Sequence, residues 1–160
     1  MSIIRAHSKL AEPATLPFSW PTRSGHQPTV LVVEAHDDTR KMLCMLLENW
    51  GCRVVEACNG LEAVEAAFRE RLQLVLMEGR LPLLDGLEAT RRIRENILLD
   101  HVKILALNGS GSPRYHAEAL AAGCDDSIEK PFNIERLRTY VVQAVSYAAP
   151  PDTSPGLLSS

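Results

Sequence analysis

The chain has 160 residues, enough for one domain with a full hydrophobic core. Hydrophobic residues make up 46% of it and charged residues 23%, and the formal net charge is −3, which excludes the basic character of a protein that binds nucleic acid or anionic lipid. No apolar stretch approaches the length of a membrane span, and the four cysteines form no C-x-x-C pair, which indicates free thiols in a reducing cytoplasm.

The two ends of the chain are predicted to be flexible. Residues 1–28 carry four prolines, which break helices, and they lack the continuous apolar core of a signal peptide. Residues 148–160 turn to proline, serine and glycine, a composition typical of a disordered tail. One domain is therefore expected over residues 29–147.

Short apolar runs alternate with amphipathic stretches across this domain, which is the pattern of repeated β/α units. Five such units with short loops favour the α/β class, with one doubly wound parallel sheet and helices on both of its faces. In chain order the expected elements are strand Val30–Val33, a helix that begins near Asp37 and ends at Gly51, strand Arg53–Ala57, helix Gly60–Arg71, strand Leu74–Met77, a helix that begins at Asp85-Gly86, strand Ile104–Leu107, a helix from Pro113 to Ala122, strand Ser127–Glu129 and helix Ile134–Val145.

Several of these helix ends are marked by residues with a capping preference. Asp37 or Asp38 is expected to cap the first helix and Asn59 the second, because short polar side chains accept hydrogen bonds from the free amides of a first turn. Gly51 and Gly123 are expected to end the first and fourth helices, because glycine adopts the left-handed conformation without strain.

Polar side chains follow four of the predicted strands at the point where each strand ends. Glu34 follows the first strand, Glu78 the third, Asn108 the fourth and Lys130 the fifth. In open α/β sheets, ligands bind at the carboxyl ends of the strands, where the strand order reverses. These four side chains are therefore expected to line one crevice.

The same region carries six short segments in a characteristic order: Val32-Val33-Glu34, Leu74–Glu78, Leu81-Pro82, Leu84-Asp85-Gly86, Ala121–Asp126 and Lys130-Pro131-Phe132. In this order and spacing they resemble the CheY-like receiver domain of response regulators, over residues 29 to about 145. The resemblance implies a five-stranded sheet with the strand order 2-1-3-4-5, as in flavodoxin-like folds. It also implies a signalling module of a two-component phosphorelay, and no enzyme.

The acceptor site of this family needs oxygen ligands that the chain supplies only in part. Receivers hold magnesium with two adjacent acids after the first strand, and an aspartate after the third strand ligates the metal and attacks phosphorus. The resemblance assigns Glu34 to the first acid, Ala35 to the second and Glu78 to the acceptor. Ala35 offers no oxygen, and Glu78 reaches one methylene further than aspartate, which disturbs in-line placement. A degenerate, pseudo-receiver site is implied, with magnesium binding weak or lost and no catalytic residue.

Three further positions complete the comparison with receivers. Asn108 stands where the family has a threonine or serine that senses the phosphoryl group, and Ser127 where it has an aromatic residue that swings inward on activation. Lys130, which contacts phosphate in the family, is intact. The same residues also have a purely structural interpretation, in which Glu78 and Lys130 form an ion pair. Such a pair would imitate part of the phosphorylated state.

The favoured function is a cytoplasmic receiver-like module that is not phosphorylated on aspartate and acts through protein contacts. Its expected partners are a histidine kinase, a phosphotransfer protein or an output domain, met through the last helices and strands; nucleic acid and membrane are not expected, and a homodimer is left open. One alternative is a working receiver in which Glu34 with Asp37 or Asp38 binds magnesium, the one cofactor considered, and phosphate is accepted at a non-standard site. The other is an unrelated flavodoxin-like binding protein or enzyme, which the lack of G-x-G-x-x-G and Walker patterns disfavours.

Overall fold

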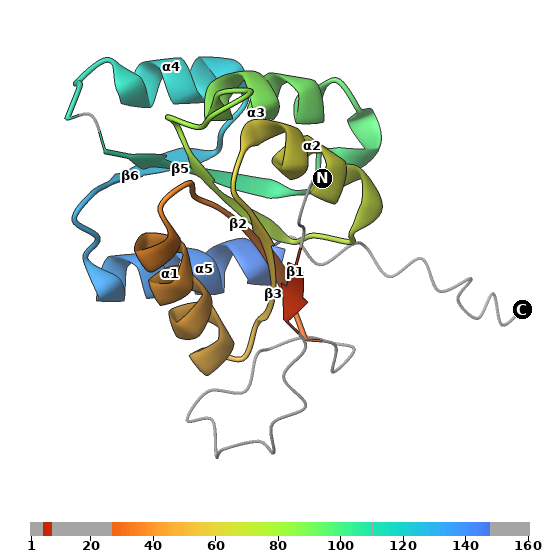
Figure 1. Ribbon diagram of the computed structural model, residues 1–160, viewed down its shortest axis with the longest axis vertical. Helices are drawn as coiled ribbons and strands as arrows, with labels where there is room; N and C mark the ends of the chain where they lie inside the picture. The colour runs from red at the N-terminus through yellow and green to blue at the C-terminus, as the bar shows by residue number, and fades with distance from the viewer. Residues whose placement is uncertain (1–4, 8–26, 110, 148–160) are drawn as a thin grey trace, which may run out of the picture.

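A computed structural model describes residues 5–7, 27–109 and 111–147 of the chain. It contains six strands in one sheet, with helices packed against both faces (Figure 1). The strands are β1 (Arg5–His7), β2 (Thr29–Val33), β3 (Arg53–Ala57), β4 (Leu74–Glu78), β5 (Lys103–Asn108) and β6 (Asp126–Glu129). The helices are α1 (Asp37–Asn49), α2 (Gly60–Arg69), α3 (Gly86–Arg94), the short 3-10 helix η1 (Ile97–Leu99), α4 (Tyr115–Ala122) and α5 (Ile134–Tyr147).

The predicted doubly wound sheet is confirmed. The strand order is β1-β3-β2-β4-β5-β6, and every pair from β3 to β6 is parallel. The five parallel strands therefore have the order 2-1-3-4-5 when they are numbered along the chain. The order reverses between β2 and β4, so the carboxyl ends of these two strands flank the place where such folds put their ligand sites.

The strand β1 was not predicted from the sequence. It pairs antiparallel with β3 at the edge of the sheet, with Arg5 opposite Glu56 and His7 opposite Val54. The expectation of a flexible extension over residues 1–28 therefore does not hold at these three residues. The physical reason is that β3 is the outermost parallel strand, and its free backbone groups accept an extended segment whatever its side chains are. Residues 1–4, 8–26 and 148–160, where flexibility was also predicted, lie outside the described part of the chain.

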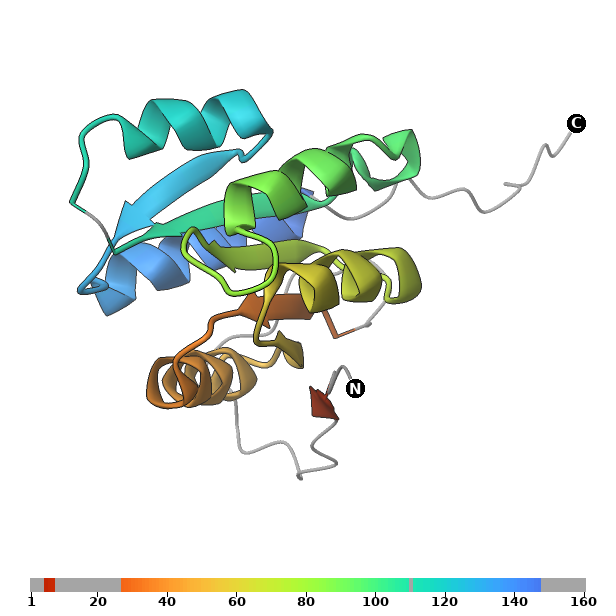
Figure 2. The same cartoon turned by 45° about the horizontal axis from the view of Figure 1, so that its top comes forward.

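Each face of the sheet carries its own apolar core, because the central strands are buried on both faces. Leu31 of β2 packs in a cluster with residues of α2, α3 and α4. Val32, its neighbour in the chain, packs in a second cluster with residues of α1 and α5. Figure 2 shows the sheet between these two layers of helices. The alternation of strand side chains thus ties each helix to one face of the sheet.

The capping predictions are confirmed except at the N-terminus of α1; Gly51, with a φ of 89°, follows the C-cap of that helix as expected. Asn59 accepts a hydrogen bond from the Glu62 amide at 2.8 Å, and Gly123 ends α4 with a φ of 114°. The N-cap of α1 is His36, without a side-chain cap bond, so the prediction of a cap by Asp37 or Asp38 is wrong. The helix begins at Asp37, as expected, so both aspartates lie inside its first turn.

Among the described helices, none is long and apolar enough to cross a membrane.

Candidate functional site

Four polar side chains meet at the carboxyl ends of the parallel strands. Glu34 directly follows β2, Glu78 is the last residue of β4, Asn108 ends β5, and Lys130 directly follows β6. Glu34 is fully buried, and Glu78 and Asn108 are 6% and 4% exposed. All four line one open cleft, as predicted from the sequence. The parallel sheet explains the meeting, because parallel strands end at the same edge.

The ammonium group of Lys130 bridges the two buried carboxylates. Lys130 Nζ lies 2.7 Å from Glu34 Oε2 and also donates to Glu78 Oε2. The ring of Phe132 lies beneath the same ammonium, with its centroid 5.9 Å from Nζ. The predicted ion pair of Glu78 and Lys130 is therefore present, and Glu34 extends it to three charged groups.

Burial alone would lower the pKa of Lys130, because a low dielectric disfavours the charged amine. The hydrogen bonds and charges of Glu34 and Glu78 act in the opposite direction and outweigh burial, so the pKa of Lys130 lies above its ordinary value. Lys130 is therefore a fixed cation at neutral pH.

The other oxygen of each carboxylate accepts a backbone hydrogen bond. The amide of His36 donates to Glu34 Oε1 at 3.2 Å, and the amide of Arg80 donates to Glu78 Oε1 at 3.3 Å. All four carboxylate oxygens therefore have a donor. The two loops that follow β2 and β4 wrap around the acids and hold them toward Lys130.

The residues present do not fit the magnesium site that the family implies. Magnesium needs several oxygen ligands at about 2.0–2.1 Å, and here the nearest acids are bound to an ammonium group while Ala35 supplies no oxygen. In the described part of the chain, no group of three His, Cys, Asp or Glu side chains is placed to hold a metal ion.

Asp37 and Asp38 do not join the cluster. Asp37 Oδ1 pairs with Arg40 Nη2 at 2.5 Å, and its side chain is 72% exposed. The hydrogen bond and the charge of Arg40 lower the pKa of Asp37. Asp38 is exposed on the same first turn and does not line the cleft. This geometry does not support the prediction that Asp37 or Asp38 binds magnesium together with Glu34.

Ser127 does not line the cleft. Its hydroxyl is 2.7 Å from Nδ1 of His116, so it connects β6 to α4. Asn108 lines the cleft, and its main-chain carbonyl oxygen accepts a hydrogen bond from the main-chain amide of Lys130 at 2.8 Å. The structure thus brings together three of the four matched switch and acceptor positions: Glu78, Asn108 and Lys130.

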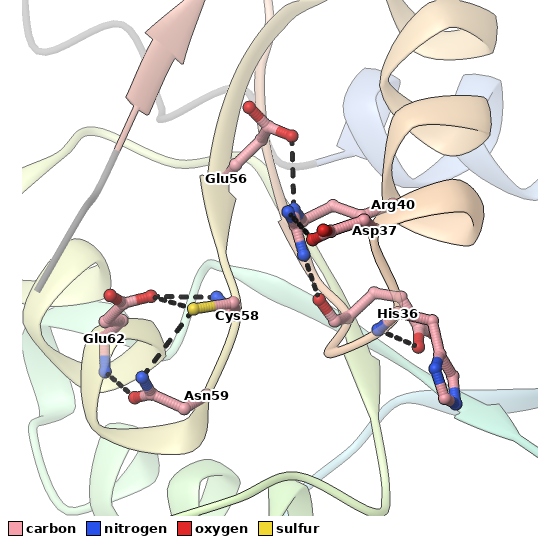
Figure 3. A network of polar contacts seen from close by, with 8 residues as sticks. His36, Asp37, Arg40, Glu56, Cys58, Asn59 and Glu62 are labelled. Carbon is pink, nitrogen blue, oxygen red and sulfur yellow. Dashed lines mark hydrogen bonds and ion pairs between the residues drawn. The ribbon is translucent and has the colours of Figure 1, made fainter.

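Sequence reasoning missed Arg40, which fixes the loop after β2 (Figure 3). Its Nη1 donates to the Glu34 carbonyl oxygen at 2.9 Å, and its Nε lies 3.3 Å from Glu56 Oε1. With the Asp37 contact, one guanidinium joins the end of β2, the last residues of β3 and the first turn of α1. An arginine one turn into the helix was the available signal, because arginine makes several hydrogen bonds at fixed angles.

Tyr115 is a second residue that the sequence did not reveal. Its ring covers Gly79, where an added Cβ would collide with the phenol. Its hydroxyl is buried and has no hydrogen-bond partner among the described residues. Burial raises the pKa of Tyr115, which keeps the hydroxyl protonated. The first turn of α4 therefore packs directly on the loop that follows Glu78.

Comparison with known sequences identifies relatives of this chain. The family description "Response regulator receiver domain" matches residues 30–142. The transcriptional regulatory protein SrrA of Staphylococcus aureus is 33% identical over 104 residues, which are 65% of this chain and 42% of SrrA. The chain therefore spans less than half the length of the curated relatives it matches.

Solved structures agree with the sequence matches. The receiver domain of the sensor histidine kinase PA1611 from Pseudomonas aeruginosa PAO1, solved with magnesium in its active site cleft, is 32% identical with a TM-score of 0.70; the match covers 75% of this chain and 98% of that one. A chain in the co-crystal structure of the Saccharomyces cerevisiae proteins Ypd1 and Ssk1 (receiver domain) is 29% identical with a TM-score of 0.71, and the coverage is 79% and 94%. The chain belongs to the response regulator receiver domain family of two-component systems.

Proposed function

We propose that this receiver domain works without phosphorylation of an aspartate and signals through protein contacts. The observation that supports the proposal most is the Lys130 ammonium between Glu34 and Glu78. In a working receiver the acceptor carboxylate must be free to attack phosphorus. Here the residue at the acceptor position is held by an ion pair on one oxygen and by a backbone amide on the other.

The length of the side chain at position 78 supports the same proposal. Glutamate places its carboxylate about 1.5 Å further from the backbone than aspartate does, the length of one carbon–carbon bond. Phosphoryl transfer depends on in-line placement, and a displacement on the order of 1 Å lowers such rates by roughly a hundredfold. Ala35 removes the second acid, so the metal that would neutralise the incoming phosphate has lost a ligand as well.

The acidic cluster also supports a fixed signalling state. A phosphoryl group carries about 1.5 to 2 negative charges at neutral pH, whereas glutamate carries one. The contact from Glu78 to Lys130 would imitate part of the phosphorylated arrangement, without a step that reverses it. We propose that the output of the domain is set by its folded surface and by the amount of protein present.

We propose that the partner is a histidine kinase, a phosphotransfer protein or an output domain. The relatives support this class, since one matched structure is the receiver of a sensor histidine kinase and another contains a receiver with a phosphotransfer protein. The surface we assign to this contact is formed by the last elements of the fold, α4, β6 and α5.

Mass spectrometry of the intact chain tests the proposal. The chain is incubated with acetyl phosphate and magnesium, beside a matched variant that carries Ala35→Asp and Glu78→Asp. The proposal expects no stable phosphoryl adduct on the unaltered chain. A stoichiometric gain of one phosphoryl group by the unaltered chain would refute it and favour the alternative of a magnesium-dependent acceptor. A gain by the variant alone would show that the two substitutions account for the lost reaction.

A further inference from the structure

The strand β6 forms one edge of the sheet, and among the described strands it pairs only with β5. Figure 2 shows it between α4 and α5. The main-chain amide of Lys130 donates to the carbonyl oxygen of Asn108 at 2.8 Å, so the backbone groups of Lys130 face β5. Backbone groups of successive residues in a strand point to opposite edges. Ile128 therefore faces β5 as well, whereas the backbone groups of Ser127 and Glu129 face outward.

Three of these four outward backbone groups meet no strand in the described part of the chain. The amide of Ser127 donates to Asp126 Oδ1 at 2.7 Å, which leaves the Ser127 carbonyl and both backbone groups of Glu129 open to a further strand. An unpaired sheet edge is a template for an extended segment. The opposite edge of the same sheet shows this, because β1 adds to β3 there with three residues.

A groove of about 330 Å³ lies between β6 and α5, beside this open edge. Its volume falls in the range of ligand-binding pockets, which begin at about 300 Å³. Two buried side chains, Leu105 and Ile128, give it an apolar lining. The α5 side of the groove consists of polar side chains three or four positions apart, which therefore share one face of the helix: Arg136, Thr139, Tyr140 and Gln143.

These four α5 side chains can all donate hydrogen bonds, and among the described residues none of them has a hydrogen-bond or ion-pair partner. Burial raises the pKa of Tyr140, so its phenol stays protonated and remains a donor. The acid of the groove, Asp126, already accepts the amide of Ser127. The guanidinium of Arg136 is therefore the charge in this groove that lacks a counter-ion, and it is positive.

We propose that the groove binds an extended segment of a partner protein, which adds to β6 as a further strand and places an acidic side chain on Arg136. The seven residues from Arg136 to Gln143 span about 10.5 Å of helix, which about three residues of extended chain match. Alternate residues of a strand point to the same face. An apolar residue two positions from the acid therefore lies on Leu105 and Ile128. This contact rests on the proposed function, signalling through protein contacts, and gives the partner segment its chemistry.

A short peptide tests the contact on the full chain. The peptide acetyl-Thr-Glu-Thr-Val-Thr-amide is titrated into the isotope-labelled chain, without acetyl phosphate, and backbone amides are followed by NMR. The Glu129 amide is expected to shift saturably and to exchange at least about tenfold more slowly with bound peptide. The Ile128 amide, which faces β5, is the internal control and is expected to keep its exchange rate.

Two N-methylated peptides separate strand addition from a contact of side chains alone. One carries methyl groups on the amides of glutamate and valine, and the other on the amides of the second and third threonines. Only alternate amides of an added strand face β6, so one of these peptides is expected to bind like the parent and the other to lose binding. Equal binding of both peptides would overturn the proposal.

Two substitutions with the same change of net charge test the acidic contact. Arg136→Gln is expected to weaken peptide binding about two- to fivefold, whereas Arg69→Gln, in a surface pair on α2, leaves it unchanged. Equal affinities of these variants would overturn the assignment of Arg136, and no change at Glu129 with millimolar peptide would overturn the whole proposal.

Two other occupants of the groove are distinguished in the same experiment. Protection of the Glu129 amide without peptide that is lost on deletion of residues 148–160 would assign the groove to this chain's own tail and overturn the proposal. Protection that rises with protein concentration alone would assign it to a second copy, with the same consequence. None of these results bears on phosphorylation at Glu78, which the mass measurement tests separately.

Discussion

Replacing Lys130 with methionine keeps most of the side-chain length and removes the charge at the centre of the cluster. Glu34 is fully buried and the Glu78 side chain is 8% exposed, so the substitution leaves two neighbouring carboxylates without their cation. Removal of one partner from a buried ion pair costs about 3–5 kcal/mol of folding free energy. The Lys130 side chain is 23% exposed, which screens the pair in part. We therefore expect a loss of about 3–4 kcal/mol at neutral pH.

Urea unfolding measures this loss, because small folded domains usually unfold in one cooperative step. With a slope of roughly 1–3 kcal/mol per molar urea, the midpoint is expected to fall by about 1–4 M without a change of slope. Lys103→Met is the matched control. Lys103 Nζ lies 3.7 Å from Asp125 Oδ1, and the side chains are 38% and 32% exposed, so removal of this surface pair is expected to cost less than about 1 kcal/mol.

A second substitution shows whether charge is the cause. Glu78→Gln in the Lys130→Met chain removes one of the two unpaired carboxylates, so it is expected to restore part of the lost stability. The reasoning would be refuted if Lys130→Met lost no more stability than Lys103→Met. It would also be refuted if Glu78→Gln brought a further loss, because the two carboxylates would then not be the source of the destabilisation.

Three further predictions concern the same fold. Asn59→Ala is expected to lower the unfolding free energy by about 0.5–2 kcal/mol through loss of the α2 cap, whereas Asp38→Ala, which removes no cap, is expected to leave it nearly unchanged in urea titrations. Gly86→Ala is expected to lower the unfolding free energy by about 1–3 kcal/mol or more in the same assay, because the new Cβ would collide with the Glu78 carbonyl oxygen. Gly109→Ala is the control, since its new Cβ would make only an ordinary van der Waals contact, and it is expected to leave the unfolding free energy nearly unchanged. The pKa of Lys130 is raised in the folded chain, so the stabilisation that its charge provides is complete below the ordinary pKa of 10.5. That stabilisation is lost as the pH rises through the pKa of Lys130 in the folded chain. Between neutral and alkaline pH, the unfolding free energy is therefore expected to fall more steeply in the unaltered chain than in Lys130→Met.

The parallel sheet was predictable because its signals are local. Each strand is a short apolar run, and a helix cap such as Asn59 directly precedes the helix that it caps. The meeting of Glu34, Glu78, Asn108 and Lys130 was predictable for the same reason, since each directly ends or follows a parallel strand. A residue at such a position has a defined place in the fold before any contact is known.

Three features were not predictable, because they depend on contacts that residue preferences do not show. The strand β1 has no apolar alternation, and it forms because β3 has a free edge. Arg40 is one charged residue among several on a helix, and only the fold brings it to Glu56 and to the end of β2. The cap of α1 was assigned to an aspartate on preference alone, whereas Asp37 is occupied by Arg40.

We propose that the carboxylate of Glu78 is held by Lys130 and does not take up phosphorus. Fluorine NMR of the chain with beryllium fluoride and magnesium tests this most directly, because a beryllium fluoride adduct takes the place of a phosphoryl group on the acceptor. We predict only the signals of free fluoride species for the unaltered chain, with no bound resonance at saturating reagent. A bound resonance that disappears in Glu78→Gln would contradict the account.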